Sequence, residues 1–251
     1  MSVDDPVYAD LQLLARAQRL SDWLVSQYAD AIRGEVAEIG AGIGTFTDLI
    51  LQRGVDRLVA IEPEPAYAAF LERRFVDPRV TVRRETLPDA RSLEPGRFDL
   101  VVCQNVLEHI HDHHAALTAM GRSLAPGGQL TIVVPAHPRL CGALDRRYGH
   151  HRRYTQAMLR EVVETSGLEI IRIYPFNLLG VAGWWLRRRS GSSGLGARSL
   201  AAYDQLVRAW RPLEERLRPP WGLSLVAHLR PALGRSGSGS AYAAPARHPR
   251  R

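Results

Sequence analysis

The chain has 251 residues, of which 45% are hydrophobic and 24% are charged, as in a soluble globular protein with one α/β domain and an appendage. Its two cysteines exclude a disulfide-rich fold, and no apolar run reaches the roughly 20 residues of a membrane-spanning helix. Residues 126–251 hold 20 of the 33 arginines but only seven of the 26 acidic residues, which predicts an anionic membrane surface, phosphorylated lipid or nucleic acid as partner.

The first 34 residues predict a helical cap. Their opening stretch is acidic and polar, so no signal peptide is expected, and the cysteine usage predicts a cytoplasmic protein. We expect one or two amphipathic helices here that either cover a ligand site or only pack on the core. The apolar residues at near-helical spacing are Tyr8, Leu11, Leu14, Leu20, Trp23, Leu24 and Tyr28.

Residues 35–62 predict a strand, a glycine turn, a helix and a second strand. Glycines at 40, 42 and 44 give a backbone without Cβ atoms, which can turn sharply and let a ligand approach. The second strand ends on Glu62, eighteen residues past Gly44. A carboxylate there can accept hydrogen bonds from two neighbouring hydroxyls, so the unit is suited to a ribose.

The spacing GxGxG, with Glu38 just before it, favours a cationic ligand over a pyrophosphate. EIGAGIG resembles the first motif of class I S-adenosylmethionine-dependent methyltransferases of the small-molecule and lipid type. On this stretch alone, a glycine turn in another α/β protein stays open. The resemblance implies S-adenosylmethionine as cofactor. The cofactor-binding residues implied here are Glu38, Gly40, Ala41, Gly42, Gly44, Glu62 and Pro63.

The stretch RVTVRRETL predicts a third strand that ends near Glu85. The family resemblance places an acidic residue at this end, where it accepts from the adenine amino group, and so implies contacts by Glu85, Thr86 and Leu87. Family members more often show Gly-Asp where this chain has Arg84-Glu85. An exposed loop carboxylate is the alternative.

FDLVVCQNVLEHI predicts a buried strand whose carboxyl end, Gln104-Asn105, faces the ligand crevice of an open α/β sheet. It resembles strand four of small-molecule methyltransferases, which implies cofactor contacts by these two residues. It differs from the Pro-Pro-aromatic motif of nucleic-acid amino-methylases and so argues against a nucleic-acid substrate.

His109 follows on a helical turn and is the first choice for a general base. In ubiquinone-type O-methyltransferases, which share this pattern, a further acid joins Glu108 and His109 to hold a divalent ion. Asn105 stands at that position and is a poorer ligand, so no metal is predicted. L-x-P-G-G at 124–128 and the strand QLTIVVP after it are a further landmark of the same family.

Residues 136–155 should select the acceptor, because they follow strand five at the same carboxyl edge. They resemble the D-x-x-x-G-H-x-R-R-Y-T stretch of bacterial methyltransferases associated with polyprenyl-linked sugars. His150 is the second candidate base, and a helix-entry loop with solvated arginines is the alternative. The candidate substrate residues are Asp145, Tyr148, Arg153 and Tyr154.

The remaining sequence predicts a helix to Ser166, a sixth strand in LEIIRIYPF and a last strand in residues 222–229. Residues 177–220 form a helical insertion whose tryptophans and arginines suit either a membrane interface or packing on the domain or in a dimer. Residues 232–251 have the composition of a disordered basic tail.

These patterns together predict an α/β protein with a Rossmann-like class I methyltransferase fold over residues 35–231. Its seven-stranded, mostly parallel sheet should have an antiparallel last strand with the helical insertion before it. The expected function is S-adenosylmethionine-dependent methylation of a small-molecule or lipid-linked acceptor, such as a polyprenyl saccharide or a quinone-like compound, with peripheral contact to an anionic membrane. An RNA methyltransferase and a non-catalytic membrane adaptor are the alternatives. The sequence leaves the acceptor atom and the oligomeric state open.

Overall fold

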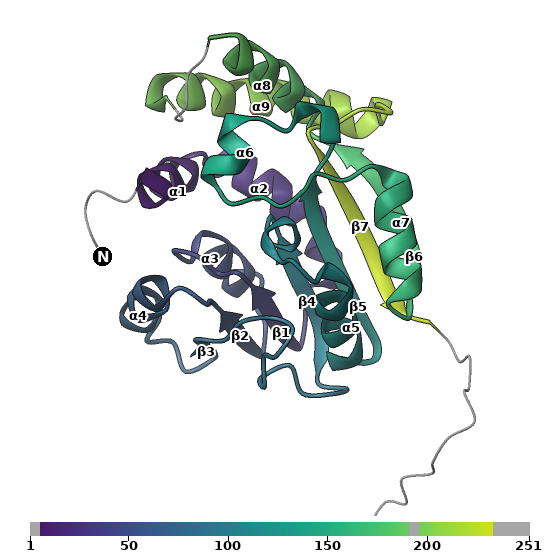
Figure 1. Cartoon of the computed structure of the whole chain (residues 1–251). Helices are drawn as coiled ribbons and strands as arrows, with labels where there is room; N and C mark the ends of the chain where they lie inside the picture. The colour runs from purple at the N-terminus through teal and green to yellow at the C-terminus, as the bar shows by residue number, and fades with distance from the viewer. Residues whose placement is uncertain (1–5, 191–195, 233–251) are drawn as a thin grey trace, which may run out of the picture.

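A computed structural model describes residues 6–190 and 196–232 of the protein. Its centre is a seven-stranded sheet in the order β3-β2-β1-β4-β5-β7-β6 (Figure 1). β7 runs antiparallel between β5 and β6, and the other neighbours are parallel. This confirms the predicted fold class, including the antiparallel last strand. The strands are β1 (Glu35–Ile39), β2 (Arg57–Ile61), β3 (Val80–Arg83), β4 (Phe98–Gln104), β5 (Leu124–Pro135), β6 (Leu168–Phe176) and β7 (Ser224–Pro231).

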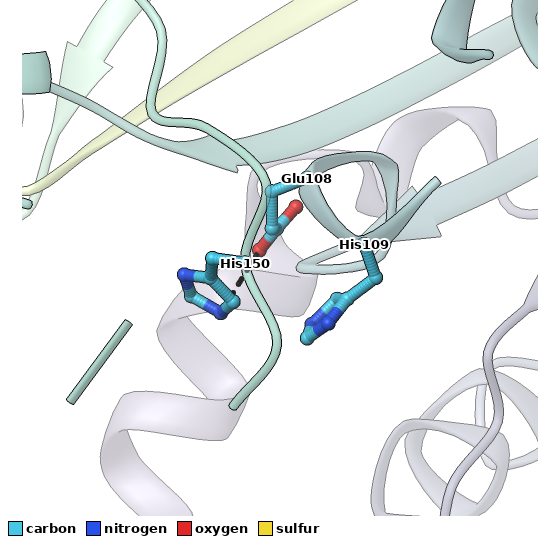
Figure 2. Close-up of side chains that lie close together, drawn as sticks. All are labelled: Glu108, His109 and His150. Carbon is cyan, nitrogen blue, oxygen red and sulfur yellow. Dashed lines mark ion pairs between the residues drawn. The ribbon is translucent and has the colours of Figure 1, made fainter. Parts of the chain in front are cut away.

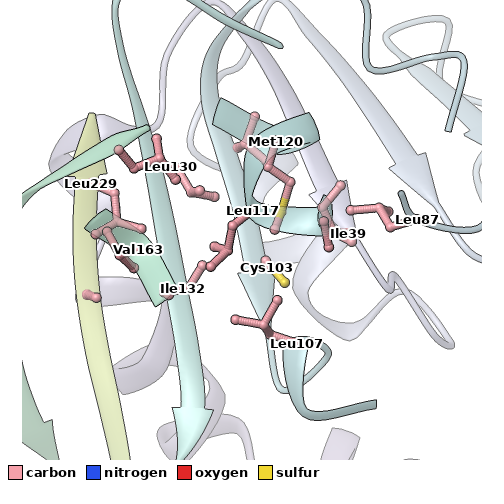
Figure 3. Close-up of a cluster of buried hydrophobic side chains, with 14 of the residues drawn as sticks. Ile39, Leu87, Cys103, Leu107, Leu117, Met120, Leu130, Ile132, Val163 and Leu229 are labelled. Atoms are coloured by element: carbon pink, nitrogen blue, oxygen red, sulfur yellow. The ribbon is translucent and has the colours of Figure 1, made fainter. Parts of the chain in front are cut away.

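Helices cover both faces of the sheet because the strands alternate two sets of apolar side chains. Leu117 and Met120 of α5, with Val163 of α7, pack on one face in the largest buried cluster (Figure 3). Helices α2 and α3 pack on the other face, where Tyr28 and Ile50 join the strand residues. The helices are α1 (Pro6–Arg16), α2 (Gln18–Ser26), α3 (Thr45–Leu51), α4 (Pro65–Arg74), α5 (His113–Ser123), α6 (Ala143–Arg147), α7 (Gln156–Thr165), α8 (Leu178–Ser190) and α9 (Ala197–Leu217).

The strand register brings three predicted cofactor segments to one edge of the sheet. Ile39 pairs with Ile61 of β2 on one side and with Cys103 of β4 on the other. The glycine turn, Glu62 and Gln104 therefore begin at the same height, at the carboxyl ends of adjacent parallel strands. This is the edge where open α/β sheets bind ligands.

The insertion between β6 and β7 forms α8 and α9, which lie side by side at the end of the molecule that also carries α6 (Figure 1). The buried Glu214 carboxylate accepts from the backbone N–H of Asn177 at 2.6 Å and of Leu178 at 3.0 Å, so α9 holds the start of α8. Asp204 accepts from Leu20 N at 3.0 Å and from Arg19 at 3.1 Å, which ties α9 to α2. The helices of the insertion are thus part of the packed domain.

Several details depart from the expected pattern. β3 ends at Arg83, so Glu85 lies in the following loop rather than on the strand. In α7, Leu159 and Val163 are buried, whereas Met158 is exposed although it is adjacent to Leu159. The tail predicted at 232–251 lies outside the described residues apart from Ala232. None of the helices in residues 6–190 and 196–232 is long and apolar enough to cross a membrane.

Candidate active site

The glycine turn and Glu62 form one preorganised unit. Glu62 is buried, and its Oε2 accepts from Gly42 N–H at 2.7 Å while its Oε1 accepts from Glu64 N–H at 3.0 Å. Each carboxylate oxygen has a second acceptor position, so both can still receive a hydroxyl of a ribose. Burial raises the pKa of Glu62, and the two backbone hydrogen bonds oppose that effect.

The three glycines have different physical roles. A Cβ on Gly40 would lie 2.3 Å from Val106 Cγ2, and one on Gly44 would lie 2.4 Å from the Phe75 ring, so both are required by packing. Gly42 has φ +57°, and a Cβ there would meet no atom within 4 Å among the described residues. Gly42 therefore borders open space above the turn, where a ligand has room. Ala41, between the glycines, is buried.

Glu38 lies beneath the turn rather than on its surface. Its side chain is buried, and its Oε2 accepts from Thr47 Oγ1 at 2.6 Å. Burial raises the pKa of Glu38 to about 8, against the lowering effect of the Thr47 hydrogen bond. A cation bound above the turn would favour the ionised carboxylate.

The raised pKa of Glu38 predicts a pH-dependent stability. Glu38 ionises near 4.5 in the unfolded chain and at about 8 in the folded protein, so the folded state keeps a proton that the unfolded chain releases. The free energy of unfolding should therefore fall as the pH rises from about 5 to about 8. Glu38→Gln should remove on the order of 4 kcal/mol of this fall, measured by urea unfolding of the ligand-free protein. The exposed control Glu64→Gln should lose stability with rising pH as steeply as wild type does. If Glu38→Gln also loses stability as steeply as wild type, Glu38 is not the group whose pKa is raised by folding.

The end of β4 contributes an amide to the same space. Gln104 Oε1 accepts from Tyr28 OH at 3.3 Å, and the buried Gln104 Nε2 has no hydrogen-bond partner among the described residues. Asn105 follows in a left-handed conformation, with φ 52°, and is exposed. A buried unpaired donor next to Gly42 and Glu62 fits a polar ligand that would complete it. Pro63, on the other side of the turn, is exposed.

The loop after β3 holds the residues implied for adenine. Glu85 Oε2 accepts from Ser92 N at 3.0 Å and from Ser92 Oγ at 2.6 Å, so this carboxylate is fixed by its own loop. Thr86 is exposed, whereas Leu87 is buried in the core cluster with Ile39 (Figure 3). The adenine contacts of these three residues stay a prediction.

A second group of polar side chains lies beyond the end of β4. Glu108 and His109 come from the short helical turn after the strand, and His150 comes from the segment after α6 (Figure 2). Their ligand atoms all lie within 4.8 Å of one another, and His150 Nε2 is 4.0 Å from Glu108 Oε1. The two imidazoles meet edge to face, with ring centroids 4.7 Å apart. Both predicted bases thus lie in one cluster.

Asp145 holds His150 in place. The fully buried Asp145 carboxylate accepts from His150 Nδ1 at 3.0 Å, from Arg153 Nε at 2.7 Å and from Gly142 N at 2.8 Å. Burial opposes ionisation of Asp145, but the hydrogen bonds from His150 and Arg153 outweigh it and lower its pKa to about 2. Because Asp145 is ionised, His150 carries its proton on Nδ1, which leaves Nε2 directed at Glu108 and His109.

The charges in this cluster are unusual. Both oxygens of the buried Glu108 lack a hydrogen-bond partner among the described residues, and burial raises the pKa of Glu108 to about 8. Burial, followed by the charge of His150, lowers the pKa of His109 to about 4. The sequence pattern predicted no metal because Asn105 replaces an acidic ligand. His150 is a third donor that the pattern did not include, and one carboxylate with two imidazoles fits a divalent ion such as zinc.

The residues expected to select the acceptor are mostly interior. Asp145, Arg153 and Tyr154 are buried, which favours a supporting role over direct contact with an acceptor. Arg153 also donates to Ala136 O at 3.2 Å, and its guanidinium lies 4.2 Å from the centroid of the Trp184 ring of α8.

Two further hydrogen bonds join α1 and α8 to the segment around α6. Tyr148 OH donates to the buried Asp10 of α1 at 2.7 Å, so the N-terminal cap is tied to α6. Trp184 Nε1 donates to Leu140 O at 3.1 Å, so α8 is tied to the segment before α6. Sequence reasoning missed Asp10 and Trp184 as part of the site, because each reaches it through a long-range contact.

Comparison with known proteins supplies the family context. Residues 11–173 match the family model described as a methyltransferase domain. The chain is 30% identical over 109 residues to the ubiquinone biosynthesis O-methyltransferase of Xanthomonas oryzae pv. oryzae, which covers 43% of this chain and 46% of that protein. It is 27% identical over 112 residues to the same-named protein of Dechloromonas aromatica, which covers 44% and 48%. The chain spans about half the length of these curated relatives.

Solved structures agree on the fold. Geranyl diphosphate methyltransferase in complex with SAM has a TM-score of 0.63 and 15% identity, covering 92% of this chain and 93% of that chain. The 1,6-didemethyltoxoflavin-N1-methyltransferase of Burkholderia thailandensis has a TM-score of 0.56 and 20% identity, covering 89% and 82%. At these identities the likeness concerns the arrangement of strands and helices.

Proposed function

The chain belongs to the methyltransferase domain family of S-adenosylmethionine-dependent enzymes, and from this we propose that it transfers the cofactor's methyl group to a small-molecule or lipid-linked acceptor. The observation that supports this best is the position of two half-sites at one edge of the sheet. The glycine turn with Glu62 would hold the nucleoside, and Glu108, His109 and His150 would face the acceptor. Glu108 and His109 follow Gln104, at the strand end beside the first half-site, by four and five residues.

The residues around the glycine turn and the end of β4 have positions that suit binding of the methyl donor. When bound, the cofactor supplies a sulfonium whose methyl group is displaced in line by an acceptor oxygen, nitrogen or carbon. Glu62 and Gly42 would fix the ribose, and Gln104 and Asn105 would fix the polar end of the cofactor beside them. The chain then contributes alignment and exclusion of water, which supply much of the rate enhancement in such reactions.

We assign His150 as the group that accepts the acceptor's proton, ahead of His109. The ionised Asp145 holds the Nδ1–H of His150, so Nε2 is free to take a proton. A pKa of about 4 makes His109 a weak proton acceptor at neutral pH. If Glu108, His109 and His150 instead hold a divalent ion, His150 would be a ligand rather than the base, and the ion would supply Lewis-acid activation of the acceptor oxygen.

We propose a quinone-like phenol or a polyprenyl saccharide as acceptor, used by a cytoplasmic protein that contacts the inner face of the membrane. The partial match to proteins named ubiquinone biosynthesis O-methyltransferase supports the first class. The arginine-rich second half supports an acceptor carried by an anionic lipid surface.

His150→Gln tests the assignment of the base. With labelled cofactor and a catechol or a lipid extract as acceptor, we expect methyl transfer to fall by about 10²- to 10⁴-fold, the usual contribution of general base catalysis. Calorimetry should give a cofactor affinity within about twofold of wild type, because His150 lies outside the nucleoside half-site.

The control His151→Gln replaces the neighbouring exposed histidine and should keep the wild-type rate. Equal rates for His150→Gln and wild type would exclude His150 as the base. Absence of cofactor binding to the wild-type protein would instead overturn the proposed function and favour a non-catalytic role.

A further inference from the structure

Helix α9 exposes a row of leucines to solvent. Leu206, Leu213 and Leu217 are 56%, 43% and 63% exposed, and their spacing of seven and four residues places them on one side of the helix. Trp221, 61% exposed, follows four residues after Leu217. Contiguous large apolar side chains on a surface commonly mark an interaction site.

Folding does not require this row. Another side of α9 is already packed, with Val207 buried in a cluster with Trp23, Phe176 and Val226. Asp204 and Glu214 add hydrogen bonds to α2 and to the start of α8. The exposed leucines therefore form a second apolar surface, next to the one that holds the helix on the domain.

The charge around the row is positive. Arg216 flanks the row on α9 and Arg218 follows just after the helix, and both are exposed, whereas Arg208 lies on the opposite side of α9. The acidic residues of the helix do not balance them, because Asp204 and Glu214 are buried and Glu215 pairs with Arg211 at 2.8 Å. Leucine and tryptophan beside arginine are the composition of a helix that lies in a lipid interface.

We infer that the surface formed by Leu206, Leu213, Leu217 and Trp221, with Arg216 and Arg218 beside them, binds an anionic lipid bilayer; this surface is here called the α9 face. The leucines and the tryptophan would enter the interface, and the arginines would meet lipid phosphates. A second copy of the chain fits less well, since a two-fold contact through this face would bring the same arginines together.

Trp221 of the α9 face lies beside a cavity near the segment that carries His150. Trp221 stacks on His137, with ring centroids 5.4 Å apart and planes 25° apart. His137, Tyr154, Pro220 and other residues line a cavity of about 160 Å³ at the end of β5, and Tyr154 follows Arg153 of the cluster around Asp145. A lipid-linked acceptor held at the bilayer would then lie on the same side of the molecule as this cavity. This last step rests on the proposed function, whereas lipid binding by the α9 face does not.

Sedimentation of the full chain with phosphatidylcholine vesicles, with and without phosphatidylglycerol, tests the inference. Wild type should sediment with the anionic vesicles only, and less so as salt is raised. Arg216→Gln with Arg218→Gln should weaken partitioning roughly thirtyfold, since each basic residue at such a surface contributes about a factor of five. The triple change of Leu206, Leu213 and Leu217 to Gln should weaken it at least about tenfold.

Matched controls lie elsewhere on the surface. Arg57→Gln with Arg160→Gln removes two exposed arginines, and Val76→Gln with Met158→Gln removes two exposed apolar side chains. Both control variants should sediment like wild type. Failure of wild type to sediment, or equal losses in the control and α9-face variants, would overturn the inference. So would a wild-type dimer that the triple leucine change converts to a monomer.

Cofactor calorimetry on the same preparations separates the two proposals. Retained S-adenosylmethionine binding with no vesicle binding would remove the α9 face and leave the proposed function standing. Vesicle binding without cofactor binding would remove the proposed function and leave lipid binding by the α9 face standing.

Discussion

Glu62→Ala is expected to lower the affinity for S-adenosylmethionine by about 100-fold or more. The carboxylate is placed to accept both ribose hydroxyls, and each hydrogen bond to a charged group contributes about 1.5–3 kcal/mol. The substitution also removes the acceptor for Gly42 N–H and Glu64 N–H, which hold the turn in its ligand-binding shape. Titration calorimetry with S-adenosylmethionine and with S-adenosylhomocysteine measures the loss.

Two companion variants sharpen this result. Glu64→Ala removes an exposed carboxylate two residues away but keeps the backbone N–H that binds Glu62, so its affinity should match wild type. Glu62→Gln keeps the shape and one acceptor oxygen, and an intermediate affinity is expected. An affinity within threefold of wild type for Glu62→Ala would show that the ribose is held elsewhere.

The nucleoside half of the site follows from the sequence because it is built from local patterns. Short apolar runs that alternate with helical segments along the chain predict parallel strands. Parallel strands in register bring their carboxyl ends together. Gly42, Glu62 and Gln104 therefore converge as expected from a strand, a turn and a strand end. The fold class and the antiparallel last strand were predictable for the same reason.

The acceptor half depends on contacts that no local pattern encodes. His150 reaches Glu108 from a segment about 40 residues later, and Asp145 becomes an interior anion only because Arg153 folds back on it. The link from Tyr148 to Asp10 joins residues 138 positions apart in the chain. The sequence predicted a substrate-selecting stretch here, and the structure places much of that stretch in a buried hydrogen-bond network.

Asp145→Ala should be the most destabilising of the substitutions considered for this site. It would leave the Arg153 guanidinium buried with no anion, and removal of one partner from a buried ion pair typically costs about 3–5 kcal/mol. His150 Nδ1 and Gly142 N–H would lose their acceptor at the same time. Urea unfolding at neutral pH measures the free energy, and a cost below about 1 kcal/mol would show that solvent screens this pair.

Measurements at several pH values and with Arg153 replaced separate the effect of the charge of Asp145 on stability from the effect of its shape. The folded pKa of Asp145 is about 2 against an ordinary 3.8, so its stabilisation is present above pH ~4 and is lost as the pH falls toward 2. The gap between wild type and Asp145→Ala should narrow over that range. Asp145→Asn keeps an acceptor for His150 but no charge for Arg153, and its stability should lie between that of wild type and that of Asp145→Ala.

Arg153→Met in the Asp145→Ala background should recover part of the stability, because it removes the buried cation that has lost its anion. If it recovers none, the loss arises from His150 and Gly142, and the ion pair is not what holds the acceptor half of the site together.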